Sequence, residues 1–255
     1  MATYRKTCSL CEALCGLLID VEEGEITSIR GNPDDVFSEG YICPKGVALQ
    51  DLHNDPNRLR APVRRVGDEW EEISWDEALN EVADKLTAAR EKYGRQGLGV
   101  YLGNPNVHHY SSLIFGPTLV GALHSKKNYS ATSADQLPHM FAAYHMFGHQ
   151  LMVPVPDVNR TAHMVIIGAN PAASNGSLMT APNMQKRLKD IRKRGGKVVL
   201  IDPRRTETAK LADEHHFIRP GTDAVFLMAW FNVLVEEIGI QSGAWEAYTD
   251  GVEVV

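Results

Sequence analysis

Four cysteines close to the N-terminus offer the clearest chemistry in this sequence. Cys8, Cys11, Cys15 and Cys43 are spaced C-x2-C-x3-C, followed by 27 intervening residues and the fourth cysteine. Three thiolates this close together can bind one inorganic centre only if the backbone loops around it, and the fourth must return from elsewhere. A structural zinc site usually takes two C-x2-C-type pairs. The three-plus-one spacing therefore favours a [4Fe–4S] cluster over zinc or over four unrelated buried thiols.

The residues around the fourth cysteine make this prediction more specific. Residues 40–46 read Gly-Tyr-Ile-Cys-Pro-Lys-Gly. This segment resembles the iron–sulfur segment of the molybdopterin oxidoreductases of the dimethyl sulfoxide reductase superfamily. The resemblance implies a bis(molybdopterin guanine dinucleotide) cofactor carrying molybdenum or tungsten. It also implies a catalytic role for Lys45, between the cluster and the pterin, whereas the residue alone would be interpreted as an exposed lysine in a turn.

Small and polar residues follow three predicted strands in the second half of the chain. Ligands of open α/β sheets bind in the crevice at the carboxyl ends of the strands. The small residues from Gly168 onward allow phosphates to approach the backbone, Asp202 suits a sugar, and Arg204 suits pyrophosphate. The carboxylate of Asp223 suits the N1–H and amine of guanine. Strand-to-helix turns and helix N-caps, the latter at Thr206 among others, are the alternative interpretation.

This series of strand ends resembles the guanine-dinucleotide-binding region of the same superfamily, and residues 103–105 resemble its earlier strand-end motif. The resemblance implies these cofactor-binding residues: Gly103, Asn104, Gly168, Asn170, Pro171, Ser174, Asn175, Asp202, Arg204, Thr206, Gly221, Thr222 and Asp223.

In the superfamily that the sequence resembles, the metal takes one protein ligand or none, and a ligand would lie near residues 128–137, which contain no cysteine. Ser133 and Asp135 are the candidates, and we favour Asp135. Either side chain can instead cap a helix that begins near Gln136. His108 follows the Asn-Pro turn, and we predict that it lines the active-site funnel, with a packed or exposed histidine as the alternative.

The pattern of apolar residues predicts the elements that position these groups. Strands alternating with helices predict a doubly wound, mostly parallel, Rossmann-like α/β region over residues 59–255, after a small β-rich iron–sulfur domain over residues 1–58. The predicted strands are 98–102, 128–133, 164–168, 198–201 and 216–218, after a hairpin over 17–29 and a linker over 54–66. The predicted helices are 75–93, 108–123, 136–148, 179–194 and 224–238. The first of these helices begins at a capping box formed by Ser74 and Glu77.

Composition and charge narrow the function further. The chain is 44% hydrophobic and 23% charged with a net charge of −6, which is typical of a globular protein and disfavours nucleic-acid binding. It contains no apolar stretch long enough for a membrane span and no recognisable secretory signal, so we expect a cytoplasmic protein.

The resemblance implies an oxidoreductase that converts a small substrate and exchanges electrons with a redox partner protein or subunit through the cluster. The alternative is an electron-transfer iron–sulfur subunit of a larger respiratory complex without metal–pterin catalysis. Members of the superfamily are longer, so we expect this chain to be an N-terminal portion whose C-terminal domain is missing.

Overall fold

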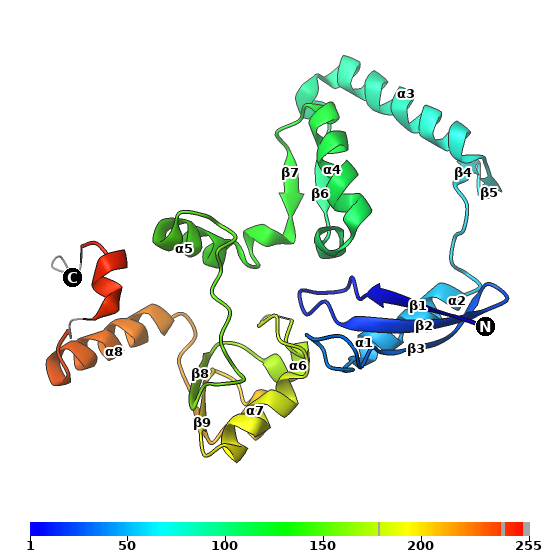
Figure 1. Cartoon of the computed structure of the whole chain (residues 1–255). Coiled ribbons are helices and arrows are strands. Elements are labelled where there is room, and N and C mark those ends of the chain that lie inside the picture. Colours follow the sequence, from blue (N-terminus) through cyan, green and yellow to red (C-terminus); the bar gives the residue numbers. More distant parts are fainter. Residues whose placement is uncertain (178, 241–242, 252–255) are drawn as a thin grey trace.

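The computed structural model describes residues 1–177, 179–240 and 243–251, without the side chains of residues 104, 105 and 245. A three-stranded antiparallel sheet, in the order β1-β2-β3, begins the chain (Figure 1). Its strands are β1 (Ala2–Thr7), β2 (Gly16–Glu22) and β3 (Glu25–Gly31). Glu23 and Gly24 both have positive φ, at 52° and 88°, as tight hairpin turns require. The predicted hairpin is confirmed.

Two short helices and a hairpin follow this sheet. They are α1 (Pro44–Val47), α2 (Leu49–Asn54), β4 (Val63–Val66) and β5 (Glu69–Glu72). Asn54 at the end of α2 links this helix to β3. Its side chain accepts a hydrogen bond from Ile26 N at 3.3 Å and donates one to Ile26 O at 2.8 Å. The prediction of a linker up to residue 66 was wrong for residues 63–66, which pair antiparallel with β5.

The next region contains a parallel pair of strands and its helices. Their bounds are α3 (Trp75–Tyr93), η1 (Arg95–Gly97), β6 (Val100–Leu102), η2 (Asn104–His108), α4 (Tyr110–Leu123), β7 (Asn128–Ser130), η3 (Ala131–Ser133) and α5 (Leu137–Phe147). The capping box is confirmed, since Ser74 Oγ accepts from Glu77 N at 3.2 Å while Glu77 Oε2 accepts from Ser74 N at 3.0 Å. The β6–α4–β7 crossover places β7 parallel to β6.

A second parallel sheet, in the order β10-β9-β8, carries most of the predicted site. Its elements are β8 (His163–Ile167), α6 (Pro171–Ser174), α7 (Met184–Lys193), β9 (Lys197–Ile201), η4 (Thr208–Lys210), β10 (Glu214–His216), α8 (Asp223–Glu237) and η5 (Ala244–Tyr248). Leu188 and Ile191 of α7 are fully buried against Val198 and Leu200 of β9. The mixed α/β class with mostly parallel strands is confirmed, with the parallel strands divided between two sheets.

Three predicted boundaries were wrong. The strand predicted over residues 128–133 ends at Ser130, and residues 131–133 form η3 instead. Helix α7 begins five residues later than predicted, because Pro182 disfavours the helical conformation at the residue before it and Asn183 adopts φ 61°. Strand β10 ends at His216, where the prediction began it.

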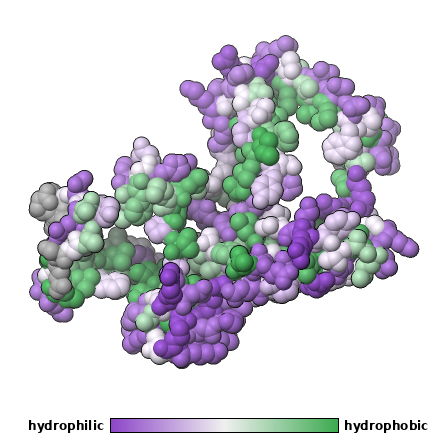
Figure 2. Space-filling model, in the orientation of Figure 1, coloured by the Kyte–Doolittle hydropathy of each residue, from purple (hydrophilic) through white to green (hydrophobic). Residues whose placement is uncertain are grey.

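Apolar side chains are widely exposed on three helices. Figure 2 shows hydrophobic residues along α4, α5 and α8. The total accessible area is 17982 Å², against about 11,000 Å² for a compact monomer of this length. Many large apolar side chains on these helices are exposed, which is typical of an interaction surface. No helix within the described residues is both long and apolar enough to cross a membrane.

Candidate functional site

The first three cysteines lie on a loop that folds back on itself. Cys8 N donates to Cys15 O at 2.9 Å, and Leu14 N donates to Cys11 O at 3.2 Å. Leu14 adopts φ 45°, which reverses the chain within the motif. The fourth cysteine, Cys43, is the N-cap residue of α1 and returns beside this loop. The backbone thus loops so that all four cysteines lie beside one another, as the cysteine spacing requires.

All four cysteines line one small pocket. The other lining residues are Leu10, Ala13, Leu14, Tyr41, Ile42, Lys45, Gly46, Ser174 and Asn175. Gly46 fits close to the cysteines, because a Cβ there would lie 2.8 Å from Ile42 Cγ1 and 4.0 Å from Cys8 Sγ. The structure therefore brings together the four predicted ligands and Lys45, and it adds Ser174 and Asn175 from a distant part of the sequence.

The thiols of this pocket influence one another. Burial, and after it the neighbouring thiols of Cys8, Cys11 and Cys43, together raise the pKa of Cys15 to about 11. Burial also raises the pKa of Cys8, while the positive charge of Lys45 lowers it. In the described part of the chain, no three His, Cys, Asp or Glu side chains are close enough to share a single metal ion. A four-iron cluster does not need that arrangement, since each thiolate binds its own iron.

Glu12, inside the cysteine loop, connects it to two distant segments. Its Oε1 accepts from Gln136 Nε2 at 3.0 Å, and its Oε2 accepts from Ser177 Oγ at 2.7 Å. His108 Nε2 lies 3.6 Å from Oε1, too far for a hydrogen bond. Burial would raise the pKa of Glu12, but hydrogen bonds from Ser177, its own backbone and Gln136 lower it overall. Sequence reasoning missed this residue, although a carboxylate between two cysteines of the motif was a visible signal.

A cleft of about 750 Å³ lies beside this junction, along α4 and residues 130–136. Gly103 and Asp135, both predicted site residues, line it. Gln136 is the N-cap residue of α5 and makes no side-chain cap, so neither Ser133 nor Asp135 caps this helix. Ser133 Oγ instead donates to Ser130 O at 3.2 Å. Asp135 is exposed in the cleft, and the side chain of Asn104 lies outside the described residues.

The loop after β8 is fixed to the loop after β9. Gly168 adopts φ 63°, and its N–H donates to Ile201 O at 2.9 Å. Asn170 Oδ1 accepts from Thr208 Oγ1 at 2.8 Å, while Asn170 Nδ2 donates to Glu207 Oε2 at 2.7 Å. The Asn170 side chain thus sets the loop geometry rather than pointing free toward a ligand. Pro171 is buried at the start of α6.

The ends of β9 and β10 carry the remaining predicted residues on the same edge of the sheet. Asp202 is buried, and its Oδ1 accepts from Arg204 N at 2.8 Å. Arg204 is exposed, whereas Thr206 is buried. In the loop before α8, Gly221 adopts φ 81° and Thr222 Oγ1 donates to Arg219 O at 2.7 Å. Helix α8 then begins at Asp223, without a side-chain cap from Thr222.

Three buried side-chain atoms in the described part of the chain lack a hydrogen-bond partner. They are His108 Nε2, Ser174 Oγ and Thr206 Oγ1. Buried polar groups are normally paired, so an unpaired group calls for an explanation such as an absent ligand. All three residues are among those that the sequence predicted to bind cofactor or substrate. This chemistry fits a polar ligand along the cluster pocket, the cleft and the strand ends.

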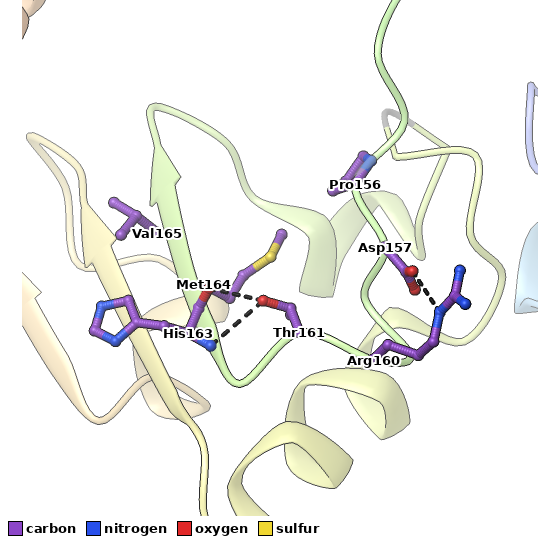
Figure 3. Close-up of a pocket in the computed structure, with 7 residues that line it drawn as sticks. All are labelled: Pro156, Asp157, Arg160, Thr161, His163, Met164 and Val165. Atoms are coloured by element: carbon purple, nitrogen blue, oxygen red, sulfur yellow. Dashed lines mark hydrogen bonds and ion pairs between the residues drawn. The ribbon is translucent and has the colours of Figure 1, made fainter. Parts of the chain in front are cut away.

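A further cavity of about 580 Å³ lies at the opposite edge of this sheet (Figure 3). It is formed by residues 156–165 at the amino end of β8. Several of its polar groups bond to one another: Arg160 Nε donates to Asp157 Oδ2 at 2.6 Å, and Thr161 Oγ1 donates to His163 O at 2.9 Å. Ligands of parallel sheets bind at the carboxyl ends of strands, so this cavity is not the candidate site.

Comparisons with known proteins cover nearly the whole chain. The sequence model described as "Molybdopterin oxidoreductase Fe4S4 domain" matches residues 1–55, and the one described as "Molybdopterin oxidoreductase" matches residues 58–251. The molybdopterin-containing subunit of thiosulfate reductase from Salmonella typhimurium is 30% identical over 96% of this chain and 31% of its own length. Formate dehydrogenase H from Escherichia coli is 27% identical over 96% of this chain and 34% of its own length.

A solved structure agrees with these matches. Acetylene hydratase from Pelobacter acetylenicus superposes with a TM-score of 0.72 and 28% identity, covering 91% of this chain and 32% of the hydratase. The chain thus spans about a third of the length of the relatives that it matches.

Proposed function

Because the chain belongs to the molybdopterin oxidoreductase family, we propose that it forms part of a molybdenum- or tungsten-dependent enzyme that oxidises or reduces a small substrate. The single observation that carries the proposal is that four thiols around one pocket accompany three unpartnered buried polar atoms at predicted site residues. Residues 1–58 would form the cluster domain and residues 59–255 the pterin-binding region.

Electrons would pass through a [4Fe–4S] cluster bound by the four cysteines. The thiols must lose their protons to bind iron, so ligation offsets the raised pKa values that burial imposes on Cys8 and Cys15. Lys45 is exposed at the pocket wall, with a flexible stem and a compact charge. That position suits a side chain that reaches from the cluster loop toward an anionic pterin.

The strand ends would hold the cofactor as bis(molybdopterin guanine dinucleotide). Asp202 is fixed by its hydrogen bond from the Arg204 amide, which suits a carboxylate that binds a ribose hydroxyl. The exposed Arg204 can pair with pyrophosphate oxygens, and the unpartnered Thr206 hydroxyl can donate to another oxygen. Asp223, at the first turn of α8, would accept from guanine. When bound, this cofactor supplies the redox chemistry, while the protein orients it.

The cleft beside α4 would receive the substrate. Asp135 lines this cleft and is the favoured protein ligand of the metal. The hydroxyl of Ser133 is less suited to that role, because it donates a hydrogen bond to Ser130 O. His108 would line the approach to this cleft from η2. The names of the relatives refer to thiosulfate, formate and acetylene, so kinship leaves the substrate open. A redox partner protein or subunit would exchange electrons with the cluster.

The test is cofactor content in holoenzyme from cells that make the pterin cofactor. Asp202→Ala and Asp223→Ala should each lower bound molybdenum or tungsten and acid-released GMP, because each removes charged hydrogen bonds worth about 1.5–3 kcal/mol. Iron should be unchanged in both variants. Asp84→Ala, an exposed change on α3, is the control. Wild-type GMP and metal content in both variants would refute the assignment of these two residues.

A further inference from the structure

A short turn from the second parallel sheet region reaches the cysteine pocket. We call residues 174–177 the α6 turn, because they comprise the last residue of α6 and the three residues after it. Tyr41 Oη donates to Asn175 Oδ1 at 2.9 Å, and Ser177 Oγ donates to Glu12 Oε2 at 2.7 Å. These bonds join residues 134 and 165 positions apart in the sequence. In Figure 1, α6 accordingly lies next to α1 and the N-terminal sheet.

The conformation of the α6 turn is tightly specified. Asn175 and Gly176 adopt φ 59° and 98°, and Asn175 Nδ2 donates to Ala173 O at 3.1 Å. A Cβ at Gly176 would overlap the carbonyl oxygen of Ala181, so only glycine fits there. The backbone of Ser174 is held as well, since its N–H donates to Asn170 O at 3.1 Å. The turn therefore presents Ser174 in a fixed position.

The hydroxyl of Ser174 is the group that this positioning leaves unexplained. Ser174 lines the same pocket as the four cysteines, yet its Oγ is buried without a hydrogen-bond partner. A buried hydroxyl left unpaired costs about 1–3 kcal/mol. The fixed turn keeps the backbone of Ser174 in place at the pocket. The oxygens of Asn175 and Tyr41 in this pocket are already bonded to each other, whereas the sulfur atoms of the cysteines, and of a cluster that they bind, are acceptors for a hydroxyl donor.

We infer that Ser174 donates a hydrogen bond to a sulfur of the bound cluster or of one of its cysteine ligands, and so raises the reduction potential of the cluster. The inference rests on the proposed function, because it requires the four cysteines to hold the cluster. A donor at sulfur stabilises the more negative, reduced cluster more than the oxidised one, and hydrogen bonds to sulfur are among the determinants of cluster potential. Ser174 is thus a positioning and tuning residue rather than a catalytic one.

This assignment changes the role of one predicted residue. The sequence placed Ser174 among the dinucleotide-binding residues of the loop after β8. That loop starts at Gly168 on the sheet edge and ends on the cysteine pocket. One short segment therefore contributes to the strand-end site and to the cysteine pocket. A movement of the loop at Gly168 would also move Ser174 beside the cysteines.

The experiment is a redox titration of the cluster, followed by EPR, in the anaerobically purified 255-residue chain. Ser174→Ala should lower the reduction equilibrium constant threefold to tenfold, a negative shift of about 30–60 mV for one electron. Ser174→Thr, which keeps the hydroxyl, should stay within 1.5-fold of wild type. The control Ser28→Ala, on β3 outside the pocket lining, should not shift. All variants are compared at equal iron content.

The outcomes separate the inference from the proposed function. An unchanged or more positive potential in Ser174→Ala would overturn the inference, because increased water access alone raises the potential. An equal negative shift in Ser174→Thr would also overturn it, since the hydroxyl would not be the cause. A wild-type chain without iron would instead refute the proposed cluster, whatever the variants show.

Discussion

The Glu12 carboxylate should hold the cysteine loop against two distant segments. It accepts hydrogen bonds from Ser177 at 2.7 Å and from Gln136 at 3.0 Å, and its side chain is only 22% exposed. Replacing Glu12 with Ala removes both bonds at once and leaves two donors facing a gap. We therefore expect residues 134–137 and 176–177 to separate from the loop more often.

The magnitude follows from these two contacts. A hydrogen bond to a charged group contributes about 1.5–3 kcal/mol when buried, and partial exposure lets water replace part of it. We expect Glu12→Ala to cost about 1–2 kcal/mol of local stability, which corresponds to an opening equilibrium raised roughly fivefold to thirtyfold. Glu12→Gln keeps an acceptor of the same shape without the charge, and should cost about half as much.

Hydrogen exchange followed by mass spectrometry measures this opening segment by segment. Peptides covering 134–137 and 176–177 should exchange faster in Glu12→Ala, while peptides from α7 and β9 should not change. Glu91→Gln, an exposed change on α3, serves as the control. The reasoning is refuted if the two segments exchange at wild-type rates in Glu12→Ala at equal iron content.

Three other predictions follow from single contacts. Lys45→Ala in the holoenzyme should slow the bleaching of the cluster after substrate addition, as measured by stopped-flow. Because the side chain is exposed, the free energy of unfolding should change by no more than about 0.5 kcal/mol. Equal bleaching rates at equal metal content would leave Lys45 a purely structural residue. Gly176→Ala should lower the free energy of unfolding by about 2–5 kcal/mol in urea titrations, since the new Cβ overlaps the Ala181 carbonyl at a positive φ; a midpoint equal to wild type would contradict the tight turn. Asp213 accepts hydrogen bonds from the backbone of β9 and from α7, and these bonds lower its pKa below the usual value of 3.8. The stability that Asp213 contributes is therefore present above pH 3.8 and is lost as the pH falls through the lowered pKa. Asp213→Asn should be less stable than wild type at pH 7, and the gap should narrow as the pH falls below 3.8; a gap that does not narrow in acid would exclude this linkage.

Local signals in the sequence predicted local structure well. The Ser74–Glu77 capping box, the hairpin at Glu23 and Gly24, and the apolar runs of β8 and β9 depend on neighbouring residues, and the structure contains all of them. The β4–β5 hairpin was missed because Arg64 and Arg65 and the glutamates of β5 hide the alternation that marks a strand.

Long-range contacts were beyond the reach of the sequence. Glu12 and Ser177 are 165 residues apart, and no periodic pattern links them. The sequence identified Ser174 as a site residue, yet only the fold shows that it lines the cysteine pocket. Asn170 was also identified as a site residue from sequence, and only the fold shows that its side chain joins the loops after β8 and β9. The candidate site residues could be identified from the sequence, whereas the residues that they contact depend on how the chain folds.

The iron content of the chain purified without oxygen tests the central claim most directly. We predict about four irons per chain and an EPR signal that appears on reduction, because four thiolates line one pocket. Cys43→Ser should lower the iron content and abolish that signal. Stoichiometric zinc without iron, after anaerobic reconstitution with iron and sulfide, would contradict the account.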